Sequence, residues 1–151
     1  TDIDDVVEGL LSKDERQVKA LFSMQRMNLR MHLSELKGLL VSSEIEDEMK
    51  NFILITMLEQ NISGIWQVSL KNRLHELDLK NLKLPYETEA YRNTYQKLRD
   101  RYESFDPSFL QLCVMELNAL SHKRFPFSHE EIDEKEVIQR VKRAFSYSID
   151  G

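Results

Sequence analysis

Residues that break helices or cross-link chains are scarce in this sequence. Its 151 residues include four glycines, three prolines and one cysteine. So few Gly and Pro residues exclude collagen-like and low-complexity disordered classes, and their scarcity favours long helices. The single cysteine, Cys113, has no partner for an intramolecular disulfide, which excludes a disulfide-stabilised scaffold. Its apolar neighbours predict a small buried thiol in a reducing, cytoplasmic compartment.

Long apolar runs are also missing. The most apolar window, Phe52–Leu58, contains Thr56 and is flanked by Lys50 and Glu59, so it is too short to cross a bilayer. The acidic start of the sequence, residues 1–5, is opposite in charge to a signal or transit peptide. No membrane partner is therefore expected. A net charge of −5 argues against a general nucleic-acid coat, although it leaves room for a local basic patch.

Several classes of catalytic and metal site lack their motifs. The glycines, at positions 9, 38, 64 and 151, form no phosphate-binding loop. The four histidines and the cysteine form no H-x-x-x-H or C-x-x-C pair, which excludes the common zinc patterns. No E-x-x-H occurs, as a carboxylate-bridged metal centre in a helical bundle would require, and no serine nucleophile elbow is found. The sequence predicts no metal and no cofactor.

Helix-start signals recur along the chain. Three S-x-x-E capping boxes begin at Ser12, Ser43 and Ser128. A fourth start is Asp106-Pro107, where the carboxylate caps the helix and proline takes the first helical position. A weaker start lies between Pro85 and Thr88. Each capping box precedes a run of apolar residues at helical spacing, so the signals predict long helices.

The apolar periodicity after these starts predicts five helices, at about 13–40, 44–77, 87–104, 107–121 and 129–147. The fourth helix is almost wholly apolar up to Leu120 and is expected at the buried centre. We see no alternating run bounded by hairpin turns. The expected fold is all-α, an up-and-down bundle of about five helices. One domain over residues 13–148 is expected after an N-terminal lead-in, residues 1–12.

Polar side chains concentrate at the end of the fourth predicted helix. Asn118 and His122 are four residues apart and share one helical face, with Lys123 and Arg124 directly beyond. Histidine can exchange a proton near pH 7, and an adjacent cation can hold a phosphate. Together these are the minimum for metal-free cleavage of RNA through its 2′-hydroxyl. The simpler interpretation is that the basic residues stabilise the helix C-terminus and that asparagine satisfies a buried neighbour.

The stretch Leu112–Arg124, with the amphipathic segment Glu136–Tyr147 after it, resembles the end of HEPN domains, which are small helical bundles. The family motif is an arginine, usually followed by a polar residue such as asparagine, with a histidine four to six residues further on. Asn118 and His122 match this motif, but Leu117 occupies the arginine position. The resemblance implies that, in active members of the family, two copies of the motif meet in a dimer and form a metal-independent ribonuclease.

Because Leu117 removes the phosphate-binding cation, we expect a catalytically degenerate, HEPN-like interaction or dimerisation module within a larger system. One alternative is an active metal-independent endoribonuclease that uses His122 with Asn118 and Arg124, for which RNA would be the partner. A second alternative is an unrelated helical protein-binding domain. A symmetric homodimer is expected, because the second and fourth predicted helices carry more apolar surface than such a bundle hides.

Tyrosines in the third predicted helix admit two interpretations. Tyr91, Tyr95 and Tyr102 repeat at helical spacing with arginines between them, so they could stack nucleic-acid bases. The same spacing is typical of a packing stripe, and we favour a place in the core or at a dimer surface.

Overall fold

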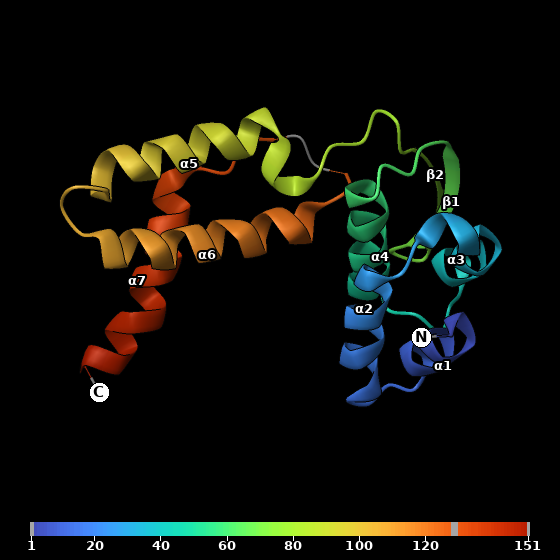
Figure 1. The fold of residues 1–151 in the computed structure, drawn as a ribbon. Helices are drawn as coiled ribbons and strands as arrows, with labels where there is room; N and C mark the ends of the chain where they lie inside the picture. The colour runs from blue at the N-terminus through green and yellow to red at the C-terminus, as the bar shows by residue number, and fades with distance from the viewer. Residues whose placement is uncertain (1, 128–129, 151) are drawn as a thin grey trace. The chain divides into compact units, whose positions relative to one another are not determined.

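The computed structural model describes residues 2–127 and 130–150, and this part of the chain is mostly helical (Figure 1). Seven α-helices, two 3-10 helices and one two-stranded sheet make up the described elements. The expectation of a helical fold is confirmed, whereas the count of five helices is wrong. The chain divides into two compact units, Thr1–Lys83 and Leu84–Gly151. That residues 13–148 form a single domain stays a prediction, because two compact units can still unfold together in one cooperative transition.

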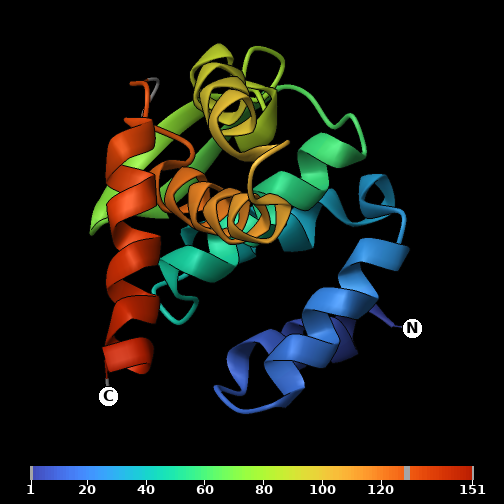
Figure 2. The ribbon, with the colours of Figure 1, turned by 90° about the vertical axis from the view of Figure 1, so that its left-hand side faces the viewer.

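The N-terminal unit contains four α-helices, a 3-10 helix and a β-hairpin. In chain order they are α1 (Ile3–Leu11), α2 (Arg16–Arg26), η1 (Leu29–His32), α3 (Leu33–Val41), α4 (Asp47–Glu59), β1 (Ile65–Leu70) and β2 (Arg73–Asp78). Helices α1 and α2 lie side by side in both views of the ribbon (Figures 1 and 2).

The N-terminal lead-in expected at 1–12 is instead a packed helix, α1. The Asp2 carboxylate caps it by accepting a hydrogen bond from the Asp4 amide at 3.2 Å. Ile3, Val6 and Leu10 fall on one face and are buried. The 3.6-residue apolar spacing across residues 3–10 is the signal that the sequence interpretation missed.

The long helix expected at 13–40 is divided into α2, η1 and α3. The capping box at Ser12 is wrong: the Ser12 hydroxyl donates to the Gly9 carbonyl at 2.7 Å and ends α1. Beyond α2, the Asn28 side chain accepts a hydrogen bond from the Arg30 amide and begins η1. The Gln60 side chain holds this junction by donating to the Met27 carbonyl at 2.8 Å and accepting from the Leu29 amide at 2.9 Å.

The helix expected at 44–77 is the largest error. Glu46 stands at the N-cap of α4 with no side-chain cap, so the capping box at Ser43 is also wrong. The helix stops eighteen residues early, at Glu59. Asn61 adopts a left-handed conformation with φ of 59°, and the Ile62 amide donates back to the Met57 carbonyl at 3.0 Å. This arrangement is a Schellman motif, which terminates helices and which asparagine can adopt.

A β-hairpin follows where a helix was expected. Strands β1 and β2 pair antiparallel with Leu70 opposite Arg73. The two-residue loop consists of Lys71 and Asn72, with φ of 53° and 60°. Positive φ at both residues is typical of a type I′ turn, whose twist matches that of the two strands. Trp66, Val68 and Leu70 alternate along β1 and point to the buried side. This period of two was overlooked because the same residues also extend the helical stripe of α4.

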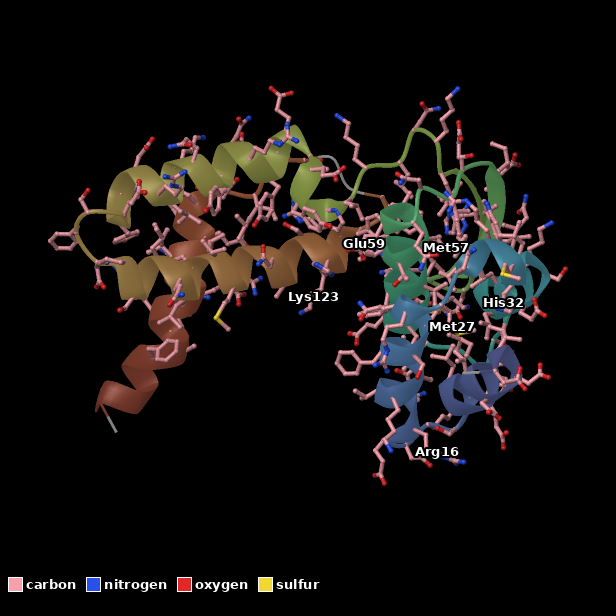
Figure 3. All side chains as sticks on the ribbon, viewed as in Figure 1. Arg16, Met27, His32, Met57, Glu59 and Lys123 are labelled. Carbon is pink, nitrogen blue, oxygen red and sulfur yellow. The ribbon has the colours of Figure 1, made fainter. Side chains whose placement is uncertain are left out.

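The interior of the N-terminal unit draws on every one of its helices and on β1. Met57 of α4, labelled in Figure 3, is fully buried. So are Leu10 of α1, Met24 of α2 and Leu36 of α3. Strand β1 packs against both α3 and α4. Burial of this many large apolar side chains supplies the driving force for folding of the unit.

The C-terminal unit contains η2 (Pro85–Glu87) and three helices, α5 (Glu89–Tyr102), α6 (Pro107–Arg124) and α7 (Glu134–Asp150). The helix start at Asp106-Pro107 is confirmed, since the Asp106 carboxylate accepts from the Phe109 amide at 3.1 Å. The weaker start is confirmed at Thr88, whose hydroxyl caps α5. The capping box at Ser128 lies outside the described residues. Helix α7 begins later than expected, at Glu134, after Asp133.

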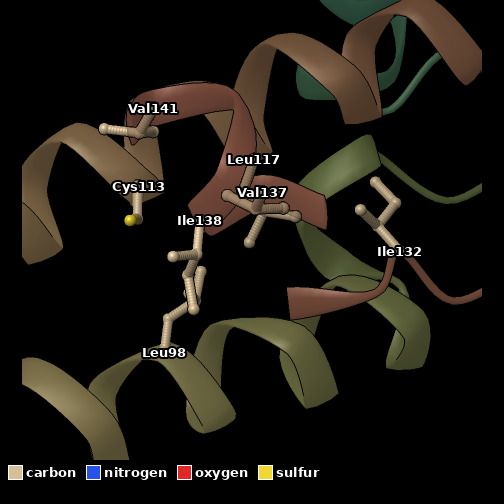
Figure 4. Close-up of a cluster of buried hydrophobic side chains, with 7 residues drawn as sticks. All are labelled: Leu98, Cys113, Leu117, Ile132, Val137, Ile138 and Val141. Carbon is tan, nitrogen blue, oxygen red and sulfur yellow. The ribbon is translucent and has the colours of Figure 1, made fainter. Parts of the chain in front are cut away.

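The core of this unit is a cluster of buried side chains shared by the three helices and the segment before α7 (Figure 4). Its members are Leu98, Cys113, Leu117, Ile132, Val137, Ile138 and Val141. Helix α6 is not the buried centre that was expected. It buries only Cys113, Leu117 and Ser121, which share one face, and it exposes Met115. Burial raises the pKa of the Cys113 thiol to about 11, and the predicted small buried thiol is confirmed.

Candidate functional site

Helix α6 carries the polar residues that the sequence pattern singled out. Asn118 and His122 are both exposed on its surface, so the prediction that they share a face is confirmed. Lys123 follows on the exposed side of the last turn (Figure 3). Within the part of the chain that the structure describes, His122 and Lys123 form no hydrogen bond and no ion pair.

Leu117 occupies the position at which the HEPN motif has an arginine, and it faces inward. Its side chain is fully buried among Cys113, Val137 and Val141 (Figure 4). Five residues of helix rotate the chain by about 500°, which places position 117 far around α6 from His122. Position 117 is therefore a packing position, and a cation there would meet an apolar core.

Arg124, the third candidate catalytic residue, is directed elsewhere. Arg124 as a residue is half-buried, and its guanidinium donates to the Glu130 carbonyl at 3.2 Å in a solvent-exposed hydrogen bond. That bond ties the end of α6 to the segment that leads into α7. The arrangement assigns Arg124 a structural role and does not join it to Asn118 and His122.

Tyr91 is the residue at this site that sequence reasoning failed to connect with Asn118. The phenol of Tyr91, on α5, donates to the Asn118 side-chain oxygen at 2.6 Å. Burial raises the pKa of Tyr91, and the neighbouring Tyr95 adds to that shift, so the phenol stays protonated as a donor. The two residues are 27 positions apart, and only the packing of α5 against α6 brings them together.

Further contacts of aromatic rings follow Tyr91 along α5. Tyr91 stacks on Tyr95 with ring centroids 6.1 Å apart and 11° between the planes. The Arg99 guanidinium lies 5.9 Å from the centroid of Tyr95 and also pairs with Glu103 at 2.7 Å. All of these tyrosines pack partly against the core of the unit, which confirms the packing interpretation of the stripe.

Several polar side chains at this site are already held in contacts with other described residues. Among the described residues no acid or base forms a hydrogen bond with His122, so this histidine has no partner for concerted proton transfer, and Lys123 directly after it is the cation nearest to it in the sequence. The Asn118 oxygen is already occupied by Tyr91, and Arg99 is neutralised by Glu103. What remains available on α6 is the exposed pair His122 and Lys123.

Metal and membrane sites find no support in residues 2–127 and 130–150. No group of three or more His, Cys, Asp or Glu side chains there could hold a metal ion. None of the described helices combines the length and the apolar character that a membrane span needs. No family model, no curated protein and no solved structure matches the chain.

Proposed function

We propose that this chain is a helical interaction and dimerisation module, resembling a catalytically degenerate HEPN domain and acting as a regulatory part of a larger system. One observation carries the proposal: Leu117 is a core residue, while His122 is exposed and forms no hydrogen bond or ion pair with any described residue. The unpaired, buried Cys113 supports a reducing, cytoplasmic location.

Exposed apolar side chains support self-association into a homodimer. Val18 and Phe22 on α2 are 55% and 58% exposed, and a spacing of four residues places them side by side on this helix. Neighbouring apolar side chains in contact with water are a feature of protein contact sites. Sedimentation of the purified chain at micromolar concentration should show a dimer, and a monomer at all concentrations would contradict this part of the proposal.

The second candidate function is a metal-independent endoribonuclease, and one observation favours it: Asn118 and His122 share an exposed face. The two functions are separated by incubating a labelled single-stranded RNA with the chain in the presence of a chelator. We expect no cleavage above background, because Leu117 stands where the motif has an arginine, and a leucine cannot stabilise the developing charge on the phosphate, a contribution of several kcal/mol in enzymes that cleave it.

The matched variants are His122→Ala and Arg124→Ala. Cleavage by the wild-type chain that both substitutions abolish would establish the ribonuclease and overturn the module. Cleavage that survives both substitutions would point to a contaminating nuclease. An unrelated helical protein-binding domain would also leave the RNA uncleaved. A measured homodimer favours the HEPN-like module over that alternative.

A further inference from the structure

The first two helices of the chain carry opposite charge. Helix α1 contains Asp4, Asp5 and Glu8 and no basic residue, whereas α2 contains Arg16, Lys19 and Arg26 and no acidic residue. The chain as a whole has a net charge of −5, so this separation departs from the average surface. The two helices together form a hairpin with an acidic and a basic member.

Both kinds of charge face the same side of this hairpin. Asp5 and Glu8 of α1 line a surface hollow of about 280 Å³ together with Arg16 and Lys19 of α2. Lys19 also borders the next hollow along α2, which Phe22 and Arg26 line. Acidic, basic and apolar side chains thus belong to one continuous surface. Figure 2 shows the two helices that carry it side by side.

Most charges on this surface form no ion pair with another described residue. Asp5, Glu8, Lys19 and Arg26 form no hydrogen bond or ion pair through their side chains among residues 2–127 and 130–150. Arg16, labelled in Figure 3, differs because it binds Asp14 at 2.9 Å. Unpaired charges of both signs are therefore available to an incoming molecule.

Apolar side chains accompany the charges on both helices. Val18 and Phe22 are more than half exposed on α2, and Leu11 is 40% exposed at the end of α1. Aromatic anchors surrounded by charged rims are typical of protein interfaces, where the apolar centre gives affinity and the charges fix orientation.

From these observations we infer that the α1–α2 surface binds the same surface of a second copy of this chain. The inference rests on the proposed dimerisation and names its interface. In a two-fold arrangement the acidic helix of one copy meets the basic helix of the other, and the same contact forms twice. Each copy supplies the charge that the facing helix of the other lacks.

Other partners match this surface less well. RNA and an anionic membrane would be attracted by Lys19 and Arg26 but repelled by Asp5 and Glu8 on the adjacent helix. An acidic peptide would leave the carboxylates of α1 unpaired. Only a partner that also carries both signs satisfies both helices, and a second copy does so by symmetry.

The dimer should be weak and sensitive to salt. Helices of 9 and 11 residues present a small contact area, which is typical of transient interfaces. Exposed charge pairs are screened at high ionic strength. We expect a micromolar dissociation constant in low salt and weaker association in concentrated sodium chloride.

The test exchanges the charges of one helix at a time in the full chain. The first variant is Lys19→Glu with Arg26→Glu, and the second is Asp5→Lys with Glu8→Lys. Analytical ultracentrifugation should show that each variant alone dissociates at least about tenfold more readily than the wild type. An equimolar mixture of the two variants should form a heterodimer, because each then supplies the charge that the other has lost.

The matched control is Lys80→Glu with Lys83→Glu, which makes the same change of charge at two lysines outside the surface. This control should dimerise like the wild type. Circular dichroism of each variant checks that its helices are intact, and heterodimer formation itself requires that both variants fold.

Three outcomes would overturn the inference. If all variants dimerise like the wild type, this surface is wrong although the proposed dimerisation stands. If folded variants are monomeric alone and also when mixed, charge complementarity between copies is wrong. If the wild type is monomeric at all concentrations, the interface and the proposed homodimer both fail. Binding of single-stranded RNA or anionic vesicles by that monomer, lost in the first variant, would assign the basic helix to that ligand instead.

Discussion

Gly9 lies where α1 packs closely against α2. A Cβ atom at position 9 would lie 2.9 Å from the Cβ of Ala20 and 3.2 Å from the Arg16 carbonyl oxygen. We predict that Gly9→Ala lowers the free energy of unfolding by about 1 to 2 kcal/mol. Because the Cβ of Ala20 cannot rotate away, the overpacking lies in the upper part of its usual range, at about 2 to 3 kcal/mol, and outweighs the gain of about 1 kcal/mol in helix propensity. Urea denaturation followed by circular dichroism measures the difference.

Gly38 provides the matched control, because it also lies within a helix but has open space around it. A Cβ atom at position 38 would meet no atom of the neighbouring elements within 4 Å among the described residues. Gly38→Ala should raise the free energy of unfolding by about 0.5 to 1 kcal/mol. Equal effects of the two substitutions would show that the contact between α1 and α2 at Gly9 is looser than described.

Lys50 is a charged side chain in the interior of the N-terminal unit. It is 2% exposed and donates to the Ser69 carbonyl at 2.8 Å, which joins α4 to β1. Burial lowers the pKa of Lys50 below its usual 10.5, although Asp47 opposes the shift. The folded protein therefore binds its proton less tightly than the unfolded chain does.

The expected result is a stability difference that depends on pH. Relative to Lys50→Met, which cannot titrate, the wild type should gain stability as pH rises from the lowered pKa toward 10.5, and the gain should level off above it. Denaturation of both proteins across this range, with the difference plotted against pH, measures the effect. A difference that stays constant would mean that Lys50 has its ordinary pKa.

The end of α4 stabilises the junction between α2 and η1 through one side chain. Gln60 uses both its amide nitrogen and its oxygen on the backbone, at Met27 and Leu29. We predict that Gln60→Ala lowers the free energy of unfolding by about 1 to 3 kcal/mol, because a part-buried amide and carbonyl lose their partner. Thermal unfolding followed by circular dichroism provides the measurement.

Gln25→Ala is the control for that substitution, since Gln25 is exposed on α2 and its side chain forms no hydrogen bond among the described residues. It should change stability by less than about 0.5 kcal/mol. If the two variants behave alike, the junction does not depend on Gln60.

Local signals in the sequence predicted some elements well. The starts at Thr88 and Asp106 were found because each cap bonds an amide three residues away. The box at Ser12 failed because Ser12 ends α1, and the amide of Arg16, the first residue of α2, donates to the Asp14 carboxylate at 2.8 Å. The prediction of a helix through residue 77 was wrong because the apolar residues of β1 fit both the helical period and the strand period of two. The left-handed Asn61 ends α4 and so decides between the two periods.

The candidate site, too, was predictable only where spacing along one helix determines it. The common face of Asn118 and His122 follows from a spacing of four residues. The contact of Tyr91 with Asn118 and the bond from Arg124 to the Glu130 carbonyl depend on how separate segments pack. Spacing along a single helix contains no information on such contacts.

At the scale of the whole molecule, the two compact units differ in construction. The N-terminal unit combines helices with a hairpin, and its separated charges support the proposed contact between copies. The C-terminal unit holds three helices around an apolar cluster and carries Asn118 and His122, on which the proposed likeness to HEPN domains rests. The proposed contact between copies and these two residues thereby belong to different units of one chain.

The burial of Cys113 has a consequence for experiments on this division. Cys113 is the only cysteine and lies in the core of the C-terminal unit, whereas Trp66 is the only tryptophan and is buried in the N-terminal unit. A thiol reagent modifies Cys113 only when its unit opens, and tryptophan fluorescence responds to the environment of the other unit. The native chain thus contains one independent spectroscopic or chemical reporter for each half. Comparing the two signals during denaturation measures directly whether the halves unfold as one cooperative domain.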